Sequence, residues 1–331
     1  MRRVAVLAAG AWGTTFGKVL ADAGADVTLW TLTPELAAAI RATRENPEFL
    51  PGIRLPDRVA ATADAAEAVD GADFVVLAVP SQVLRDNLAR WAPLVPPTAV
   101  YVSLMKGVEL GTMKRMTEVV REVANVPPER VVAVSGPNLA KEIAREQPAA
   151  TVVACESLET ARAVQAAAGT PYFRPYTNTD VVGCELGGAV KNVIALAVGM
   201  AEGMGYGDNT KAALITRGLA ETARLGVTLG ADPRTFSGLA GMGDLVATCT
   251  SPLSRNRTFG ERLGRGLTLS EATAQSAGVA EGVKSCRPTL ELARKHNVDV
   301  PITEHVVRTI HDGMPPGETV KSLMSRDMKP E

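Results

Sequence analysis

The stretch VAVLAAGAWGTTFGKVLADAG, residues 4–24, constrains the fold of this chain more than any other feature. An apolar run that passes through close-set glycines into a helical segment is typical of the strand–turn–helix that binds a dinucleotide, with the pattern GxGxxG. Gly10 and Gly13 hold the second and third positions, where backbone approaches pyrophosphate and helix packs on strand. Ala8 stands at the first position. If its backbone is left-handed, the Cβ costs about 1–2 kcal/mol, and if φ is negative the cost is near zero.

The rest of the first half alternates short β-branched runs with helical segments, which is the signature of a parallel α/β sheet. The predicted strands are 4–7, 26–30, 74–79, 99–103, 131–135 and 151–154. The predicted helices are 14–23, 35–44, 82–91, 112–124 and 158–168.

The pattern changes near Asp180, after which long Ala-, Leu- and Gly-rich helical segments follow one another. At 331 residues the chain exceeds the usual size of a single core, so two domains are expected. We predict an α/β fold, with a Rossmann-like dinucleotide-binding domain over residues 1–179 and an all-α substrate and catalytic domain over residues 180–331. The cleft between two such domains is the default ligand site.

Composition excludes several classes of function. A net charge of −1 leaves no basic surplus to neutralise the phosphates of a nucleic acid. The longest candidate membrane segment, residues 193–201, falls short of roughly 20 apolar residues, so no membrane insertion is expected. The four cysteines and three histidines show no metal-ligand spacing, and no metal is predicted. We expect a soluble cytoplasmic protein with reduced thiols.

A lysine in an apolar helix is the first candidate for chemistry. Lys191 lies within LGGAVKNVIA, residues 186–195, among side chains that cannot solvate it. Gly187 and Gly188 lie one turn before it on the same face, which leaves room for a small molecule or an approaching backbone. Alternatively, Gly183 and Gly187 only let another helix pack closely while the lysine extends to solvent. The residues alone do not decide between these interpretations.

The stretch GMGDLVATCTSPLSRNR, residues 241–257, carries further polar candidates. Asp244 and Thr248 are four residues apart and share a helix face, so the carboxylate can partner a buried lysine. Ser254 is suited to cap the next helix, whose first residues, Arg255 and Asn256, are typical of an anion site. The alternative is that this arginine-rich run is a solvated helix face.

Two shorter motifs follow predicted strands. SLMKGVE contains Lys106, and SGPNLAKE contains residues 136–138. Both therefore lie outside the carboxyl ends of their strands, which is where ligands of an open α/β sheet bind.

Several motifs thus follow one another along the chain: GAWGT, MKGVE, SGPNLAKE, ELGGAVKNVIA, ALITRGLAE, GMGDLVATCTSPLSRNR, AEGVKS and PITE. In this order they resemble the family of bacterial NAD(P)-dependent glycerol-3-phosphate dehydrogenases over essentially the whole chain. The resemblance implies a Rossmann-like domain followed by a helical domain like that of 6-phosphogluconate dehydrogenase. It also implies the reversible reduction of dihydroxyacetone phosphate to sn-glycerol 3-phosphate with NAD(P)H, which supplies glycerophospholipid synthesis.

The resemblance implies a role for each residue at a matching position. Lys191 would donate and accept the proton, with Asp244 and Lys106 as further catalytic residues. An ammonium within hydrogen-bond reach stabilises and then protonates the oxygen on which charge develops when hydride reaches a ketone. The implied substrate-binding residues are Lys106, Gly136, Asn138, Lys191, Asn192, Asp244, Thr248, Ser254, Arg255 and Asn256. The implied cofactor-binding residues are Gly10, Ala11, Trp12, Gly13, Thr31, Lys106, Ala140, Arg255, Val279 and Glu281.

The choice of cofactor rests on LWTLTPE, residues 29–35. The strand in this stretch does not end in the Asp or Glu that would bind a ribose 2′-hydroxyl and repel a 2′-phosphate. No arginine follows the strand directly, and Arg41 and Arg44 come later. We predict NADP, or dual use of NADP and NAD, at a site that a left-handed Ala8 would weaken by about 5- to 30-fold.

Two other functions stay open. A related hydroxy-acid dehydrogenase would share the two-domain layout, although SRNR and GMGDLVATC argue against it. A non-catalytic dinucleotide sensor would explain Ala8 but not the presence of Lys191 and Asp244, and it would bind NADPH without turnover. The expected partner is a small phosphorylated substrate, and a homodimer is one option for the assembly.

Overall fold

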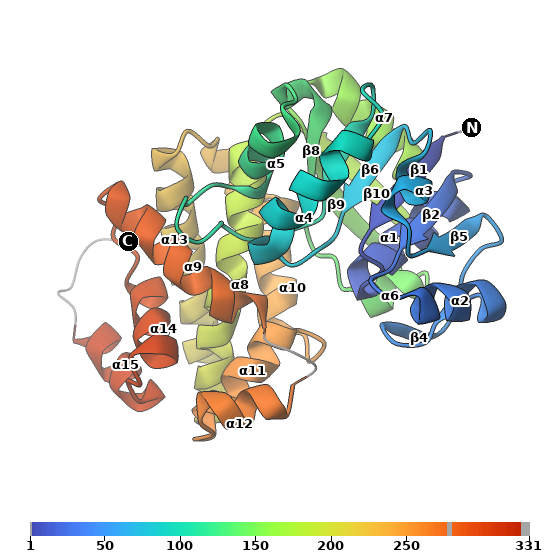
Figure 1. The fold of residues 1–331 in the computed structure, drawn as a ribbon. Coiled ribbons are helices and arrows are strands. Elements are labelled where there is room, and N and C mark those ends of the chain that lie inside the picture. Colours follow the sequence, from blue (N-terminus) through green and yellow to red (C-terminus); the bar gives the residue numbers. More distant parts are fainter. Residues whose placement is uncertain (1, 277–279, 326–331) are drawn as a thin grey trace. The chain divides into compact units, whose positions relative to one another are not determined.

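The computed structural model describes residues 2–276 and 280–325. Within them the chain divides into two compact units. The first comprises the described residues up to Lys106 together with Lys114–Glu185, and the second comprises Gly107–Met113 and the described residues from Leu186 onward. The strands of the large sheet all belong to the first unit (Figure 1).

A large sheet forms the centre of the first unit. Within the described residues its strand order is β10-β9-β8-β7-β6-β1-β2-β5. The strands are β1 (Arg3–Leu7), β2 (Asp26–Trp30), β5 (Val59–Thr62), β6 (Phe74–Leu77), β7 (Val100–Ser103), β8 (Val131–Ser135), β9 (Ala149–Ala154) and β10 (Phe173–Asn178). Val4 of β1 pairs in parallel register with Val27 of β2 and Phe74 of β6. Every strand predicted from the sequence is present, and β5 and β10 are additional.

The direction of β9 differs from the prediction. The sequence predicts that residues 151–154 continue a parallel sheet, but β9 runs antiparallel to β8. The connection contains α6 (Ala140–Ala144), and a helix of five residues rises about 7.5 Å, less than half the length of a strand of five residues. The chain therefore turns back without crossing the sheet. The longer α7 (Leu158–Ala168) does allow a crossover, and β10 lies parallel to β9.

Helices cover both faces of the large sheet because successive residues of each strand point to opposite faces. Val4 and Val6 face a core that includes Phe16 of α1. Ala5 and Leu7 face a second core on the other side. The first core is covered by α1 (Ala11–Asp22), α2 (Pro34–Thr43), α6 and α7, and the second by α3 (Ala65–Val69), α4 (Leu84–Trp91) and α5 (Met116–Ala124). Short 3-10 turns are η1 (Ser81–Val83), η2 (Ala92–Leu94) and η3 (Pro128–Arg130).

A small hairpin follows α2. Its strands, β3 (Glu45–Asn46) and β4 (Leu50–Arg54), pair antiparallel and lie outside the large sheet. Neither strand is among those predicted from the sequence. Asn46 and Leu50 are buried, so the hairpin packs on the unit rather than extending as a free loop.

The second unit is built from helices, as the sequence predicts. α8 (Val181–Gly203) begins in the first unit and continues through the second. The helices that follow are α9 (Asp208–Thr228), α10 (Asp244–Thr250), α11 (Arg255–Gly264), α12 (Leu269–Ala274), α13 (Glu281–Lys295), α14 (Pro301–His311) and α15 (Pro316–Met324). A 3-10 turn, η4 (Pro233–Ser237), and a π-helical turn, η5 (Leu239–Gly243), precede α10.

α8 corrects the expectation that no segment approaches the length of a membrane span. By length and composition alone this helix could cross a membrane, with a mean hydropathy of 1.6 in its most apolar window. In the structure 94% of that window is buried inside the protein. Such burial is typical of the core helix of a folded protein.

Glycines let α8 and α11 touch through their backbones. A Cβ added at Gly199 or Gly203 would lie 2.0 or 2.1 Å from a carbonyl oxygen of α11. A Cβ added at Gly260 would lie 2.2 Å from the carbonyl oxygen of Leu196. Interiors are close-packed, so a carbon this near a backbone oxygen forces the helices apart. The glycines of this helix pair are therefore required by packing.

Gly260→Ala should lower the free energy of unfolding by about 3 kcal/mol or more, because backbone rather than a flexible side chain must move. The matched control is Gly317→Ala in α15, where an added Cβ meets nothing within 4 Å and stability should change little or rise. Urea unfolding followed by circular dichroism measures both. Equal midpoints for the two variants would contradict a backbone contact between α8 and α11.

A buried carboxylate joins α9 to α14. Glu221 is 1% exposed and accepts hydrogen bonds from the Ile302 amide at 2.5 Å and from the Thr303 amide and hydroxyl, each at 3.2 Å. These amides lie in the first turn of α14, where backbone N–H groups lack partners within the helix. Burial raises the pKa of the Glu221 carboxyl to about 7, while these donors and the charge of Arg224 oppose the rise.

The stability of the protein should therefore fall by about 2 kcal/mol between pH 5 and pH 7 through Glu221 alone. The folded state holds a proton that the unfolded chain, with an ordinary pKa of 4.5, has released. The stabilisation is thus complete below pH 4.5 and is lost as the pH rises through about 7. Unfolding measured across this range should be flatter in Glu221→Gln. If stability changed with pH in the same way in both proteins, the raised pKa of Glu221 would be refuted.

Candidate active site

The turn after β1 answers the question that Ala8 raises. Ala8 has φ +96°, so its backbone is in the region that favours glycine, and the Cβ is strained. A Cβ at Gly13 would lie 2.2 Å from the Ala8 carbonyl oxygen, so this position must be glycine for α1 to pack on the turn. A Cβ at Gly10 would meet nothing within 4 Å. Gly10 therefore keeps open the space that a pyrophosphate requires.

The start of α1 has features that suit a bound dinucleotide. Gly10 is its N-cap and no side chain caps it, so its first amides are available to an anion. Ala11 is its first residue. Trp12 packs on Phe16 and Phe173, and its buried indole N–H has no hydrogen-bond partner within the described residues. A buried donor without a protein partner is a candidate for a contact with a ligand.

The other cofactor candidates of the first unit are more constrained. Thr31 is buried, and its hydroxyl donates to the carbonyl of Thr33 at 2.8 Å. Ala140 begins α6, and its carbonyl accepts the hydroxyl of Thr15, on α1, at 3.3 Å. Ala140 is thus tied to the helix that starts at the dinucleotide turn.

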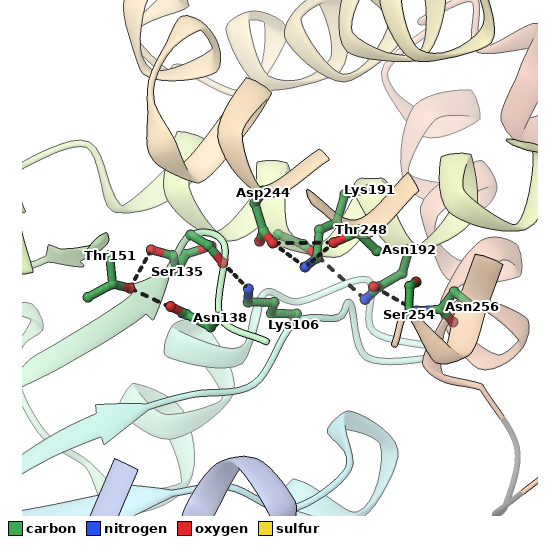
Figure 2. A network of polar contacts seen from close by, with 12 residues as sticks. Lys106, Ser135, Asn138, Thr151, Lys191, Asn192, Asp244, Thr248, Ser254 and Asn256 are labelled. Atoms are coloured by element: carbon green, nitrogen blue, oxygen red, sulfur yellow. Dashed lines mark hydrogen bonds and ion pairs between the residues drawn. The ribbon is translucent and has the colours of Figure 1, made fainter. Parts of the chain in front are cut away.

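The carboxyl ends of β7 and β8 bring together the motifs that follow them. Lys106 Nζ donates to the carbonyl of Gly136 at 2.9 Å. Asn138 Nδ2 donates to Thr151 Oγ1 at 3.1 Å, and Thr151 Oγ1 donates to the carbonyl of Ser135 at 3.0 Å (Figure 2). Asn138 Oδ1 is buried without a partner within the part of the chain that the structure describes. A hydroxyl or amine of a ligand would satisfy it.

In the second unit, Lys191 forms a buried ion pair. It lies on α8 and is 8% exposed, and Asp244 is fully buried. Lys191 Nζ contacts Asp244 Oδ1 and donates to Thr248 Oγ1 at 2.8 Å (Figure 2). The interpretation in which the lysine extends to solvent is therefore wrong. An ammonium has three donors, so one remains for an acceptor on a ligand.

A close backbone approach places Asp244 beside the lysine. The π-helical turn η5 leads directly into α10, of which Asp244 is the first residue. A Cβ at Gly187 of α8 would lie 2.3 Å from the carbonyl oxygen of Ala240 in that turn. Gly187 thus admits a neighbouring backbone, and Asp244 and Thr248 share the helix face that meets Lys191, as their spacing predicts.

The neighbouring Cys249 does not compete as a nucleophile. It is buried, and burial raises the pKa of its thiol to about 12, so it is a neutral thiol at physiological pH. Burial likewise raises the pKa of the Cys286 thiol to about 12, and it also raises the pKa of the Cys184 thiol. Lys191 and Asp244 are therefore the charged groups that lie beside the Cys249 thiol.

The start of α11 carries the remaining polar candidates. Ser254 is its N-cap, and the hydroxyl accepts the Arg257 amide at 3.2 Å, as predicted. Arg255, the first residue of the helix, is exposed. Asn256 Nδ2 donates to Asn192 Oδ1 at 2.8 Å (Figure 2).

The Asn192–Asn256 contact continues into α13. Asn256 Oδ1 accepts the Gly282 amide at 2.8 Å, so one polar chain joins α8, α11 and α13. Glu281 is the first residue of α13. Val279, which the resemblance includes among the cofactor contacts, lies outside the described residues.

Glu185 and Asn46 are among the buried polar groups that the sequence alone did not reveal. Glu185, in the first unit, accepts hydrogen bonds from the Thr117 amide at 2.9 Å, the Thr117 hydroxyl at 2.5 Å and the Arg115 guanidinium at 2.6 Å. A carboxylate in the apolar sequence VVGCELGG was the available signal, of the same kind as Lys191. Asn46 was missed because its partners, Ala9 and Thr14, are distant in sequence.

Comparison with known proteins adds to this geometry. Sequence profiles described as the N-terminus and the C-terminus of NAD-dependent glycerol-3-phosphate dehydrogenase match residues 3–161 and 180–321. The chain belongs to this family. It is therefore an NAD(P)-dependent oxidoreductase with a Rossmann-like domain followed by a helical domain, which confirms the prediction from the ordered motifs.

Individual relatives of the family cover nearly the full chain. A glycerol-3-phosphate dehydrogenase (NAD(P)+) of Frankia casuarinae is 66% identical over 100% of this chain and 98% of its own length. A glycerol-3-phosphate dehydrogenase (NAD(P)+) of Streptomyces avermitilis is 65% identical over 99% of this chain and 98% of its own length. The crystal structure of glycerol-3-phosphate dehydrogenase from Coxiella burnetii matches with a TM-score of 0.94 at 35% identity, covering 98% of this chain and 99% of that one.

The Lys191–Asp244 pair should be strongly coupled in stability. Lys191→Met leaves a buried carboxylate without its cation and should lower the free energy of unfolding by about 3–5 kcal/mol. The double variant with Asp244→Asn should lose less than the sum of the single losses, because neither charge stays uncompensated. Chemical unfolding measures all three proteins.

The exposed ion pair Arg294–Glu304, at 3.0 Å in the same unit, is the control. Arg294→Met should cost less than about 1 kcal/mol. Additive losses for Lys191→Met and Asp244→Asn would show that the two side chains do not act as a buried pair.

Proposed function

We propose that this chain catalyses the reversible reduction of dihydroxyacetone phosphate to sn-glycerol 3-phosphate with NAD(P)H. The observation that carries the proposal is the buried Lys191 ammonium. Asp244 and Thr248 hold it, and its third N–H remains available to a ligand. Membership of the glycerol-3-phosphate dehydrogenase family supports this choice of substrate. A hydroxy-acid dehydrogenase or a non-catalytic sensor has no comparable support.

Lys191 acts as the general acid. When bound, the nicotinamide cofactor supplies the hydride that the ketone carbon receives. The ammonium donates a hydrogen bond to the ketone oxygen, stabilises the charge that develops there and transfers a proton to it. In the reverse direction the neutral amine accepts the proton of the alcohol. Asp244 and Thr248 fix the position of Nζ throughout, so little reorganisation is needed at the moment of transfer.

The start of α11 holds the phosphate of the substrate. Its first-turn amides and the exposed guanidinium of Arg255 are donors suited to a phosphate, and Ser254 orders the turn as its N-cap. Asn192 and Asn256 are already hydrogen-bonded to each other, so we infer that they shape this region. Binding energy from the phosphate orients the ketone toward Lys191.

The groups at the ends of β7 and β8 contact the ligands from the first unit. Asn138 Oδ1 is suited to accept a hydrogen bond from a hydroxyl of the substrate. Lys106 is ordered by the Gly136 carbonyl and carries a positive charge suited to anionic ligands.

The turn of Gly10 to Gly13 would hold the dinucleotide. The first amides of α1 would bind its pyrophosphate, and the partnerless indole N–H of Trp12 is a candidate for a further contact with the cofactor. We infer that both NADP and NAD are used and that NADP is favoured, because Thr31 and Leu32, rather than a carboxylate that would repel a 2′-phosphate, directly follow β2. Arg41 donates to the Ala61 carbonyl at 2.7 Å, so it is held against the backbone.

The cellular setting follows from the substrate. We infer that the enzyme works in the cytoplasm and supplies glycerol 3-phosphate to glycerophospholipid synthesis. The four buried free cysteines support a reducing compartment.

The purified protein should oxidise NADPH and NADH when dihydroxyacetone phosphate is added, as measured by absorbance of the reduced cofactor. Lys191→Met should lower kcat by about 10²- to 10⁴-fold, because it removes the general acid. Arg255→Ala should mainly raise KM for the phosphorylated substrate. Unphosphorylated dihydroxyacetone is the matched control substrate and should respond little to Arg255→Ala.

Two outcomes would contradict the proposal. Binding of NADPH by fluorescence without any turnover would favour the sensor. Faster reduction of a 2-keto acid than of dihydroxyacetone phosphate would favour the hydroxy-acid dehydrogenase.

A further inference from the structure

Asn46 makes contacts that a hairpin residue does not need for its own fold. It is fully buried at the end of β3. Its Nδ2 donates to the Ala9 carbonyl and to Thr14 Oγ1, each at 2.8 Å, and its Oδ1 accepts the Phe49 amide at 3.1 Å. Both N–H bonds of the side-chain amide are therefore directed at the dinucleotide turn, and its oxygen is directed at the hairpin.

The residue held in this way adjoins the strained one. Ala9 follows Ala8, whose φ of +96° is unfavourable for any residue with a Cβ. The Ala9 carbonyl also accepts the Thr14 hydroxyl at 3.1 Å, and the Ala9 amide donates to the Trp30 carbonyl at 3.0 Å. Strained backbone persists only where surrounding contacts determine it. The residue after Ala8 is thus fixed at both its amide and its carbonyl.

The turn also determines where the ligand-binding amides of α1 lie. Gly10, the N-cap of α1, follows Ala9 directly, and no side chain caps the helix. A shift of the Ala9 carbonyl would therefore move the first amides of α1. These amides bind pyrophosphate in a dinucleotide turn.

We propose that Asn46 is a positioning residue for the cofactor, holding the turn in the left-handed conformation at Ala8 that aims the amides of α1 at the pyrophosphate. The proposal rests on dinucleotide binding at this turn. It assigns to the β3–β4 hairpin a role in cofactor affinity, exerted through one side-chain amide.

A positioning role for Asn46 can be distinguished from a merely structural one by comparing Asn46→Ala in the native chain and in an Ala8→Gly background. Asn46→Ala should weaken NADPH binding by about 5- to 30-fold, the range expected if the turn relaxes from its strained conformation. In an Ala8→Gly background the same change should cost at most a few-fold, because glycine adopts this conformation without strain. Loss of hairpin anchoring alone would weaken binding equally in both backgrounds.

The experiment is a fluorescence titration of the full chain with NADPH and with NADH, together with a thermal midpoint for each variant. Asn87→Ala is the matched control. Asn87 lies on α4, and its Nδ2 also donates to a backbone carbonyl, that of Val83, at 2.7 Å. It should leave both dissociation constants unchanged. Ala8→Gly alone should bind at least as tightly as the native chain.

A second variant keeps the test decisive if Asn46→Ala does not fold. Thr14→Val removes the other side-chain donor to the Ala9 carbonyl while keeping the side-chain volume, and it should show the same dependence on residue 8 with a smaller amplitude. Equal losses in the native and Ala8→Gly backgrounds would overturn the positioning role while cofactor binding itself persists. Failure of the native chain to bind either cofactor would instead overturn dinucleotide binding at the turn, and with it the proposed function.

Discussion

The backbone of α8 sets the geometry of the helical unit. Glycine at 187 lets the π-helical turn approach, and glycines at 199 and 203 let α11 approach, each to a distance that a Cβ would forbid. A Cβ at Gly282 of α13 would likewise lie 2.5 Å from the carbonyl of Asn192. Because backbones rather than flexible side chains meet, the side chains between these contacts have few alternative positions. Lys191 and Asn192 lie among them.

Close packing around polar groups explains why this helix can hold charge. A buried ion pair is expensive to desolvate and is tolerated only where geometry and hydrogen bonds are good. Lys191 meets a carboxylate and a hydroxyl from successive turns of α10, while Asn192 is hydrogen-bonded to Asn256. Replacing both members of a buried ion pair by well-packed apolar side chains is often neutral or stabilises a fold. The presence of Lys191 on an apolar core helix therefore agrees better with the proton transfer that we propose for it than with a role in stability.

The sequence predicts those parts of the structure that depend on local pattern. The strand periodicity, the α7 helix, the Ser254 cap and the shared face of Asp244 and Thr248 all follow from spacing of a few residues. The antiparallel return of β9, the β3–β4 hairpin and the burial of Glu185 do not, because each depends on contacts between distant segments. α8 shows the same limit, since its composition fits a membrane span and only its packing reveals a core helix.

The dinucleotide turn shows why a motif and its function can separate. The pattern alone leaves open whether an alanine in the first glycine position strains the backbone, and the φ of +96° at Ala8 shows that it does. The structure supplies compensating contacts from Asn46, 37 residues further along the chain than Ala9, and from Thr14 within α1. Hydrogen bonds to one residue can thus maintain a strained backbone conformation at the residue before it, provided that the bonded groups are buried and fully satisfied. Cofactor affinity at such a turn is a property of the turn and the hairpin together.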